Sequence, residues 1–525
     1  MSELVHDFIF HAARRAPVDR ALVYGAQQLT FADLAQAVDA AAQTLLHTGL
    51  GRAERVAVYL EKRIENVAAC FGATLAGAVF VPVNPLLKAE QVAYILADCN
   101  VRVLVTSAER LRQLTDILSS CRDLHTVLVV GATGELPQLA GIAVQAWAPA
   151  AGHRAAHRVI DTDMAAILYT SGSTGNPKGV VLSHRNMVAG AMSVASYLDL
   201  SPQDRVLAVL PLSFDYGLSQ LTSAFHAGAC VVLLNHLFAR DIVKAVAEHA
   251  ITGLAAVPPL WIQLAQLDWP AQCSLRYLTN SGGHMPVTTV AALRAALPEA
   301  SLFLMYGLTE AFRSTYLPPS ELARRPDSMG RAIPNAEVLV VRPDGTLCDD
   351  DEPGELVHRG ALVSLGYWND AARTAERFRP APGQDPALPL VEMAVWSGDT
   401  VRRDADGYLY FIGRTDDMIK VSGYRISPSE VEEAVHAADL VSEVAAFGVA
   451  HPVLGHAIVL LAVARQGAEV APALLLKECQ RRLPAYMVPA HIDIRSEAFP
   501  RNPNGKIDRK LLQQSYSTLF ESPPP

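Results

Sequence analysis

The segment 169–179, Tyr-Thr-Ser-Gly-Ser-Thr-Gly-Asn-Pro-Lys-Gly, combines the residue types that a phosphate-binding turn needs. Its glycines let backbone N–H groups approach a polyphosphate closely, and Lys178 supplies a cation to neutralise it. The segment is not a Walker A loop, because Pro177 stands directly before Lys178, where that pattern requires glycine. A solvated Ser/Gly linker is the alternative interpretation. However, the segment follows the apolar run MAAIL and precedes a helix start at Ser183, so we predict a phosphate loop between a buried strand and a helix.

Five further segments carry polar residues in patterns that are ambiguous one by one. Glu310 follows the strand-like run SLFLMYG and could be a carboxylate at a helix N-terminus, where the helix dipole favours it. Ser-Gly-Asp-Thr at 397–400 ends a similar run, and Arg-Thr-Asp-Asp at 414–417 would ordinarily be a solvated turn. Gly423, in Val-Ser-Gly-Tyr-Arg-Ile, could mark a strand bulge. The last segment, Asn-Pro-Asn-Gly-Lys-Ile-Asp-Arg-Lys at 502–510, could be an inert basic tail.

Together and in this order, these segments resemble the motifs of the adenylate-forming (AMP-binding) superfamily of acyl-CoA synthetases, peptide-synthetase adenylation domains and firefly luciferase. The likeness covers nearly the whole chain, from LTFADL at 29–34 to the last loop. It implies an ATP-dependent, AMP-forming ligase that activates a carboxylic acid as an acyl-adenylate, releases pyrophosphate and passes the acyl group to a thiol. The implied cofactors are ATP and Mg²⁺, with CoA or the phosphopantetheine of a carrier protein as acceptor.

The resemblance also implies catalytic roles. Lys506 matches the lysine that meets the reacting carboxylate and the α-phosphate, where a preorganised donor is typically worth about a hundred- to a thousandfold in rate. Thr309 is implied to reach the α-phosphate, and Glu310 to hold Mg²⁺ as its metal ligand. Asp416 is the implied hinge about which a small C-terminal domain rotates after adenylation. That rotation would remove Lys506 and present Gly423, which lines the implied thiol channel.

The nucleotide site implied by the resemblance draws on most of the chain. Tyr306 would lie against the adenine, Asp399 would bind both ribose hydroxyls, Arg414 would lie near the ribose, and Arg425 would contact phosphate. The full set of implied nucleotide-binding residues is Thr170, Ser171, Gly172, Ser173, Thr174, Gly175, Lys178, Gly282, Tyr306, Asp399, Arg414 and Arg425.

The acid-binding pocket is implied to contain Phe214, Asp215, Ser281, Met305 and Arg313. Fatty and aromatic acyl-CoA synthetases carry Phe-His or His-His where this chain has Phe214-Asp215, whereas adenylation domains use such an aspartate to bind the substrate ammonium. A buried carboxylate is costly without a cationic partner, so Asp215 favours an amino-bearing acid. Arg313 could instead pair with Asp215, leaving the site neutral and receptive to other small acids. If both charges were free, a zwitterionic or dicarboxylic substrate would fit.

We therefore expect a stand-alone adenylation enzyme that loads an amino-bearing or small polar acid onto a separate carrier protein, since no carrier domain follows Lys506. The alternative is an AMP-forming acyl-CoA ligase that uses free CoA and a non-amino acid. A luciferase-like oxidase and a catalytically silent homologue are further alternatives, but no oxygen-binding site is recognisable and the implied active-site residues are all present.

The elements that must position these residues read as an α/β protein. Helix-like segments alternate with the strand-like runs RVAVYL, FVPVN, RVLVTS, DRVLAVLPL, CVVLLN and ITGLAAVPP, the pattern of parallel strands with crossover helices. After Pro334, strand pairs joined by Asp-Gly turns predict an antiparallel β region. We expect a large, multi-layered N-terminal domain at 1–413 and a small, mobile α+β domain at 414–525.

Composition limits the remaining possibilities. The chain has 525 residues, enough for more than one domain, and a net charge of -9, which argues against a nucleic-acid partner. Its seven scattered cysteines form no close pair. The N-terminal segment lacks the apolar core of a signal peptide, and no apolar stretch is long enough to span a bilayer. We expect a cytoplasmic protein with a small carboxylic acid as its substrate.

Overall fold

The protein is described from a computed structural model. The described residues are 4–87, 89–170, 177–283, 285–414, 419–421, 424–426, 428–451, 454–466, 468, 470–483, 485–503 and 505–520. The predicted site residues that lie outside them are Ser171, Gly172, Ser173, Thr174, Gly175, Asp416 and Gly423. Arg414 and Arg425 are described as strand backbone, in β21 and β23 respectively.

The first sheet has the strand order β7-β6-β5-β3-β4-β8-β9, and its neighbours are parallel except for the antiparallel pair β8 and β9. Its strands are β3 (Arg55–Tyr59), β4 (Val79–Pro82), β5 (Val101–Ser107), β6 (Thr126–Val130), β7 (Ala143–Ala146), β8 (Met164–Thr170) and β9 (Lys178–Ser183). Both faces are covered, because Val56 and Val58 pack in one core with α2 (Phe31–His47) and α3 (Ile64–Ala76), whereas Ala57 and Tyr59 pack in another with α4 (Ala89–Asp98) and α5 (Ala108–Leu118). Alternate residues of a strand thus serve opposite faces, as in buried parallel sheets.

The second sheet has nine strands in the order β16-β15-β14-β13-β12-β10-β11-β1-β2. Its strands are β1 (Arg20–Tyr24), β2 (Gln27–Thr30), β10 (Arg205–Ala208), β11 (Cys230–Leu233), β12 (Gly253–Ala256), β13 (Tyr277–Asn280), β14 (Ser301–Tyr306), β15 (Thr315–Leu317) and β16 (Arg331–Ala332). Pairs from β1 to β14 along this order are parallel, while β2, β15 and β16 join in antiparallel fashion.

A layer of helices lies between the two sheets. Phe225 of α7 (Asp215–Ala227) and Met187 of α6 (His184–Tyr197) share one core with Val56 of the first sheet and Val231 of the second. The opposite face of the second sheet packs against α8 (Ala239–Glu248), α9 (Pro258–Leu264) and α10 (Val287–Ala296). The helix α1 (Asp7–Arg15) contributes its apolar face to the inner core.

Two further units complete the chain, the first with an antiparallel sheet and the second with a mixed sheet in which β26 pairs with β25 in parallel. The first is the five-stranded sheet of β17 (Ala336–Val341), β18 (Gly354–Gly360), β19 (Phe378–Pro380), β20 (Met393–Arg403) and β21 (Leu409–Arg414). The helix α11 (Ala371–Arg377) lies between β18 and β19 in the chain. The second contains β22 (Ile419–Val421), β23 (Tyr424–Ile426), β24 (Val441–His451), β25 (Gly455–Ala464), β26 (His491–Arg495), α12 (Pro428–His436), α13 (Pro472–Arg482) and α14 (Arg509–Ser515). Short 3-10 turns are η1 (Thr309–Ala311), η2 (Pro319–Glu321) and η3 (Ala485–Met487).

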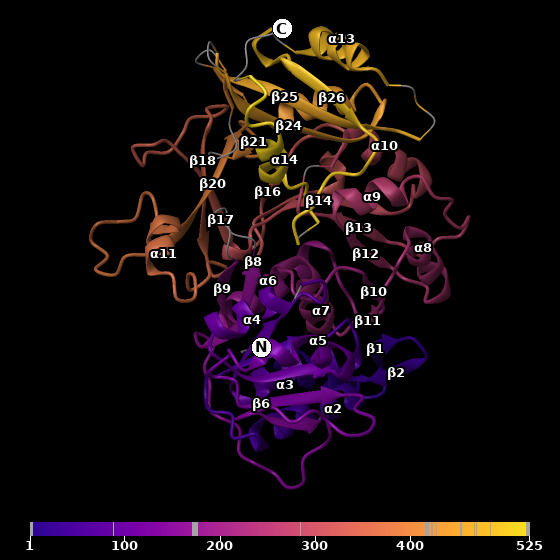
Figure 1. Ribbon diagram of the computed structural model, residues 1–525, viewed down its shortest axis with the longest axis vertical. Coiled ribbons are helices and arrows are strands. Elements are labelled where there is room, and N and C mark those ends of the chain that lie inside the picture. The colour runs from indigo at the N-terminus through magenta and orange to yellow at the C-terminus, as the bar shows by residue number, and fades with distance from the viewer. Residues whose placement is uncertain are drawn as a thin grey trace.

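These elements confirm the predicted α/β class with a large layered part and a smaller C-terminal unit, which lie at opposite ends of Figure 1. One local prediction was incomplete: the phosphate segment does not lead directly into a helix, because Lys178 begins β9 and Thr170 pairs with Lys178 across an antiparallel hairpin. The predicted boundary between residues 413 and 414 falls at the end of β21 and stays a prediction. The described residues include no helix that is both long and apolar enough to cross a membrane.

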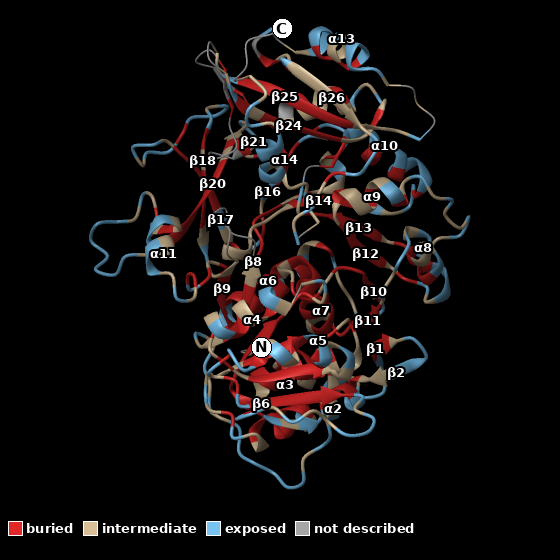
Figure 2. Ribbon diagram, viewed as in Figure 1, coloured by how far each residue is buried: buried red, intermediate tan, exposed pale blue. Residues whose placement is uncertain are grey.

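Burial follows the layers. Figure 2 shows the central strands of both large sheets buried along their length, while exposed residues gather on the outer faces of helices such as α13 and on the loops. A polar residue buried at the end of one of these strands therefore stands out against its apolar surroundings, and the polar groups discussed next are of this kind.

Candidate active site

Lys178, Glu310 and Tyr367 meet at the end of the β8–β9 hairpin. The Lys178 Nζ donates to Glu310 Oε1 at 2.7 Å and to the Tyr367 hydroxyl at 2.7 Å, and that hydroxyl donates to the same Glu310 oxygen at 2.6 Å. The Lys178 ammonium also lies 4.2 Å from the centre of the Tyr367 ring. The side chains of Lys178 and Glu310 are only 17% and 12% exposed, so solvent screens this contact weakly.

Opposing influences set the charge of Glu310. Burial raises its pKa, but the Lys178 ammonium and the hydrogen bonds from Lys178 and Tyr367 outweigh burial, so the pKa of Glu310 lies below its ordinary value. The carboxylate is therefore held ionised close to a cation, which is the state needed for a metal ligand or an electrostatic anchor. Among the described residues, no three His, Cys, Asp or Glu side chains cluster as a metal site.

A second polar pair joins the second sheet to the antiparallel region. The Tyr306 hydroxyl at the end of β14 donates a hydrogen bond to Asp399 of β20. Asp399 is 5% exposed, and its backbone N–H donates to Ser397 Oγ at 3.1 Å, which fixes the bend that aims the carboxylate. Asp399 also lies opposite Arg414 in the β20–β21 ladder. Tyr306 and Asp399, which are 93 positions apart in the sequence, are thereby in contact.

The remaining nucleotide-site predictions lie at strand ends. Thr170 closes β8, and its buried hydroxyl has no hydrogen-bond partner among the described residues, so it is available to a ligand oxygen. Ser281 and Gly282 follow β13, and Gly282 has a φ of +83°, which glycine adopts without strain. Ligands of open α/β sheets bind at the carboxyl ends of parallel strands, and β13 and β14 end at this edge.

The predicted acid pocket lies at the N-terminus of α7. Phe214 is the residue before the helix and Asp215 its first residue. Arg313, which is 2% exposed, contacts Asp215 through Nη1 at 3.4 Å and donates from Nη2 to Ser219 Oγ at 2.7 Å. Met305, in β14, is buried, and its sulfur accepts a hydrogen bond from the hydroxyl of Tyr197 at 3.0 Å.

The loop that carries Lys506 lies against the large N-terminal part. Asn84 after β4 donates from Nδ2 to the Pro503 carbonyl at 3.3 Å. Within the loop, the Lys506 N–H donates to Asn502 Oδ1 at 3.1 Å, and Gly505 has a φ of +76° that closes the turn. Burial raises the pKa of Asp215, while the charges of Arg313 and then Lys506 act in the opposite direction, so Lys506 is near enough to influence this pocket.

The structure thus brings most described site residues to one region, and it adds two that the sequence interpretation missed. Tyr367 lies 57 positions from Glu310 and 189 from Lys178, and only its place in the Gly-Tyr-Trp run after an apolar segment could have drawn notice. Ser219 had a usable signal, because it follows Asp215 by one helical turn and must share its face.

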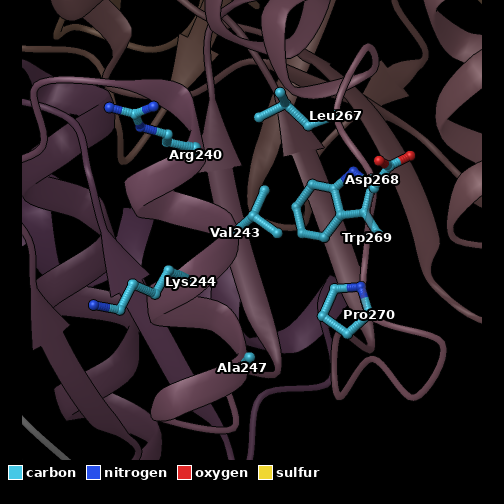
Figure 3. A pocket seen from close by; sticks show the side chains of 8 residues that line it. All are labelled: Arg240, Val243, Lys244, Ala247, Leu267, Asp268, Trp269 and Pro270. Carbon is cyan, nitrogen blue, oxygen red and sulfur yellow. The ribbon is translucent and has the colours of Figure 1, made fainter.

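A surface groove of about 470 Å³ lies elsewhere, between α8 and the segment 267–270. Figure 3 shows Trp269 facing Val243 across it, with Leu267 and Pro270 on the same side as Trp269. None of the predicted site residues lines this groove. The polar site described above is therefore the better candidate for chemistry.

Two family models match the chain. The model described as AMP-binding enzyme matches residues 9–368, and the model described as AMP-binding enzyme C-terminal domain matches residues 430–506. The first covers more than half of the chain and contains the Lys178–Glu310–Tyr367 cluster, while the second ends at Lys506.

Individual proteins show the same similarity. The chain is 31% identical to an L-proline--[L-prolyl-carrier protein] ligase of Pseudomonas fluorescens, over 97% of this chain and 99% of that protein. It is 30% identical to tyrocidine synthase 3 of Brevibacillus parabrevis over 99% of this chain, yet it spans only 8% of that synthase. A solved structure of O-succinylbenzoate coenzyme A synthetase from Bacillus subtilis, in complex with ATP and a magnesium ion, matches with a TM-score of 0.82 and 25% identity, covering 96% of this chain and 98% of that one.

Proposed function

The chain belongs to the AMP-binding enzyme family, and on this premise we propose that it is an AMP-forming acid–thiol ligase that loads an amino-bearing or other small polar acid onto a carrier protein. The end-to-end similarity to a ligase that is named for an amino acid and its carrier protein supports the choice of acceptor. Asp215 at the N-terminus of α7 supports a polar acid, since a carboxylate facing a purely apolar chain would be costly.

The observation that carries the proposal is the contact of Lys178 with Glu310 just after β14, whose last residue, Tyr306, contacts Asp399. The loop of Lys506 lies against the same large part of the chain. The reaction joins the acid's carboxylate to the α-phosphate of ATP with release of pyrophosphate, and a thiol then displaces AMP from the acyl group. Such chemistry needs cations where negative charge concentrates and fixed acceptors for the ribose hydroxyls. The cluster offers both.

Residues of this chain fit ATP and Mg²⁺. The hydroxyl of Thr170, which is buried and has no hydrogen-bond partner within the described part of the chain, and the ammonium of Lys178 suit phosphate oxygens. Asp399 suits the ribose hydroxyls. Glu310, kept ionised by its surroundings, suits Mg²⁺, which takes one or two carboxylates together with phosphate oxygens. When bound, the metal would neutralise phosphate charge. Lys178 would then exchange its contact with Glu310 for one with phosphate, while Tyr367 continues to hold the carboxylate.

Lys506 is proposed to donate to the reacting oxygens during adenylation. Support comes from the contact between Asn84 and the Pro503 carbonyl, which holds this loop against the large part of the chain. We further propose that residues 414–525 rotate as a unit about Asp416 for thioester formation, with Gly423 lining the path of the thiol and Arg414 and Arg425 contacting the nucleotide. Assembly of one catalytic arrangement at a time is a common role of such closures.

The test is pyrophosphate exchange into ATP with a panel of amino, hydroxy, aryl and fatty acids, followed by thioester detection. We expect exchange with small polar acids and acyl transfer to a phosphopantetheinylated carrier protein, with little consumption of free CoA. If pyrophosphate exchange occurred but no thioester formed, the proposed transfer to a carrier protein would be wrong. Absence of exchange with every acid would refute the ligase activity itself.

A second candidate is an acyl-CoA ligase that uses free CoA and a non-amino acid. The observation that favours it is the Asp215–Arg313 contact, because a carboxylate already paired with arginine has less need of a substrate ammonium. The similarity to a coenzyme A synthetase of known structure points the same way. Stoichiometric CoA consumption with a non-amino acid would select this candidate.

A further inference from the structure

The guanidinium of Arg313 contacts three residues in the first turns of α7. Its guanidinium contacts Asp215 at 3.4 Å and Ser219 at 2.7 Å, and its central carbon lies 4.8 Å from the centre of the Tyr216 ring. The side chain is 2% exposed, and its Nε has no hydrogen-bond partner among the described residues. A charged group as deeply buried as this keeps its place only where the surrounding structure balances its charge.

The backbone around Arg313 is shaped to place it. Phe312, the preceding residue, has a φ of +54°, a conformation that is strained for a bulky side chain. Its ring fills the space left by Gly190 of α6, where an added Cβ would lie 2.3 Å from the ring. The N–H of Arg313 donates to the Ala311 carbonyl at 2.6 Å, which tightens the turn. Strain of this kind persists where a fixed position matters, so Arg313 belongs to the construction of the pocket.

The charges around the pocket then balance in pairs. Glu310 is matched by Lys178 at 2.7 Å, and under the proposed function it would be matched by Mg²⁺ once ATP is bound, while Lys506 would be matched by the reacting carboxylate. Asp215 is matched by Arg313. None of these paired charges is left to balance a lone ammonium or a lone second carboxylate on the substrate, and an unbalanced charge in a buried site is unfavourable at low dielectric.

We propose that Arg313 is a specificity-determining residue that neutralises Asp215, so that the enzyme selects acids whose remainder, apart from the reacting carboxylate, carries no net charge. This inference rests on the proposed function and narrows its substrate. It admits small acids with hydroxyl, amide or keto groups, and amino acids whose ammonium is balanced by a second acidic group. It disfavours simple amino acids such as L-proline, and dicarboxylic acids without an amine.

The other contacts of the pocket agree with a small polar remainder. Ser219 Oγ and the Tyr216 hydroxyl are neutral polar groups of α7, and the latter is hydrogen-bonded to Thr279 Oγ1 at 2.6 Å. Trp261, which is fully buried, donates to the Thr279 carbonyl at 3.0 Å and closes the space behind them. Uncharged donors and acceptors on a rigid wall suit hydroxyl or carbonyl groups better than a bare hydrocarbon chain.

The experiment compares size-matched acids in wild-type enzyme by pyrophosphate exchange: lactate, alanine and malonate, then the corresponding hydroxy, amino and dicarboxylic acids of four to six carbons, with L-aspartate and L-proline added. We expect a kcat/KM at least tenfold higher for the hydroxy form, or for L-aspartate, than for the amino and dicarboxylic forms of the same size. A wild-type preference for alanine or L-proline overturns the inference while leaving the proposed function intact. Exchange with no acid counts against both.

Charge variants supply an independent readout. Arg313→Met removes the balancing cation and should raise the ratio of amino to hydroxy turnover on the order of 100-fold, the effect of one charge about 5 Å away at an effective dielectric constant of about 20. Asp215→Asn should shift preference toward dicarboxylic acids, and the double variant should return to neutral forms. Arg313→Lys keeps the charge and should keep the wild-type order.

Thermal denaturation of each variant separates misfolding from altered selectivity, and ratios between acids within one folded variant do not depend on the amount of active enzyme. If Arg313→Met lowers turnover of all three forms in proportion, Arg313 is merely structural and the inference fails. Should Arg313→Met not fold, the order of acids in Arg313→Lys and Asp215→Asn decides the matter, because Arg313→Lys is expected to keep the wild-type order and Asp215→Asn to shift it toward dicarboxylic acids. A wild-type order in Asp215→Asn would overturn the inference.

Discussion

Replacing Tyr367 by phenylalanine tests whether the Lys178–Glu310–Tyr367 cluster is held together as the structure indicates. The change keeps the ring beside the Lys178 ammonium and removes only the hydroxyl, which accepts from Lys178 at 2.7 Å and donates to Glu310 at 2.6 Å. The lost bond to an ionised carboxylate is of the class worth about 1.5–3 kcal/mol. With Lys178 still in contact with Glu310, we take the lower end, about 1.5 kcal/mol, or roughly a tenfold fall in pyrophosphate exchange.

The expected pH dependence of this stabilisation follows from the direction in which the pKa of Glu310 is shifted. The pKa of Glu310 lies below its ordinary value, so the stability that the cluster contributes is complete above the ordinary carboxyl range and is lost as pH falls through the lowered pKa. Removing the Tyr367 hydroxyl raises the pKa of Glu310 toward its ordinary value. The difference in thermal midpoint between wild type and Tyr367→Phe should therefore be constant near neutrality and shrink in acid.

A matched control is Tyr410→Phe, which removes a hydroxyl that donates to Asp404 at 3.0 Å outside the cluster. We expect it to leave pyrophosphate exchange at the wild-type level. If Tyr367→Phe exchanged pyrophosphate at the wild-type rate, or lost no more than Tyr410→Phe, the hydroxyl would not be holding Glu310 and the reasoning would be refuted.

Three further outcomes are expected. Lys506→Ala should abolish adenylation yet spare thioester formation from a supplied acyl-adenylate, and an equal loss of both half-reactions would contradict the two-conformation proposal. Asp399→Asn should raise the KM for ATP roughly 10- to 100-fold with a smaller effect on the KM for the acid, as measured by exchange kinetics. Burial lowers the pKa of His184 to about 4 from 6.5, so the unfolded chain binds the proton first and stability should fall as pH drops from 6.5 to about 4, by up to about 3 kcal/mol. His184→Gln should remove part of this acid dependence in thermal denaturation, and His358, whose pKa burial also lowers to about 4, should contribute to what remains.

Much of the architecture could be predicted from local patterns in the sequence. Apolar runs such as RVAVYL predicted parallel strands because burial on both faces requires an unbroken apolar sequence, and these strands are β3 and its neighbours. The antiparallel region after Pro334 was equally readable from alternating runs and Asp-Gly turns. Shorter elements were not predicted. One of them is β9, which begins at Lys178 inside the segment that was expected to lead into a helix.

The site was only partly readable. The resemblance of several motifs, in order, to those of the family located Lys178, Glu310 and Asp399 along the chain. The contacts among these residues could not be predicted from the sequence, because the partners are far apart in the chain and meet only when two sheets and the antiparallel region pack together. The role of each residue in binding ATP and Mg²⁺ stays a prediction.

A phosphate-binding segment that contains Lys178 was therefore predicted from sequence alone, through composition and spacing within one short stretch. The state of the acid pocket was decided only by tertiary structure. Sequence left open whether Asp215 faces a substrate ammonium or pairs with Arg313, because 98 positions separate the two. The fold closes that distance by packing α7 against the turn after β14, where the strained Phe312 directs Arg313 onto the helix. Charge balance in a buried site follows from which side chains meet, and only the packed chain specifies that.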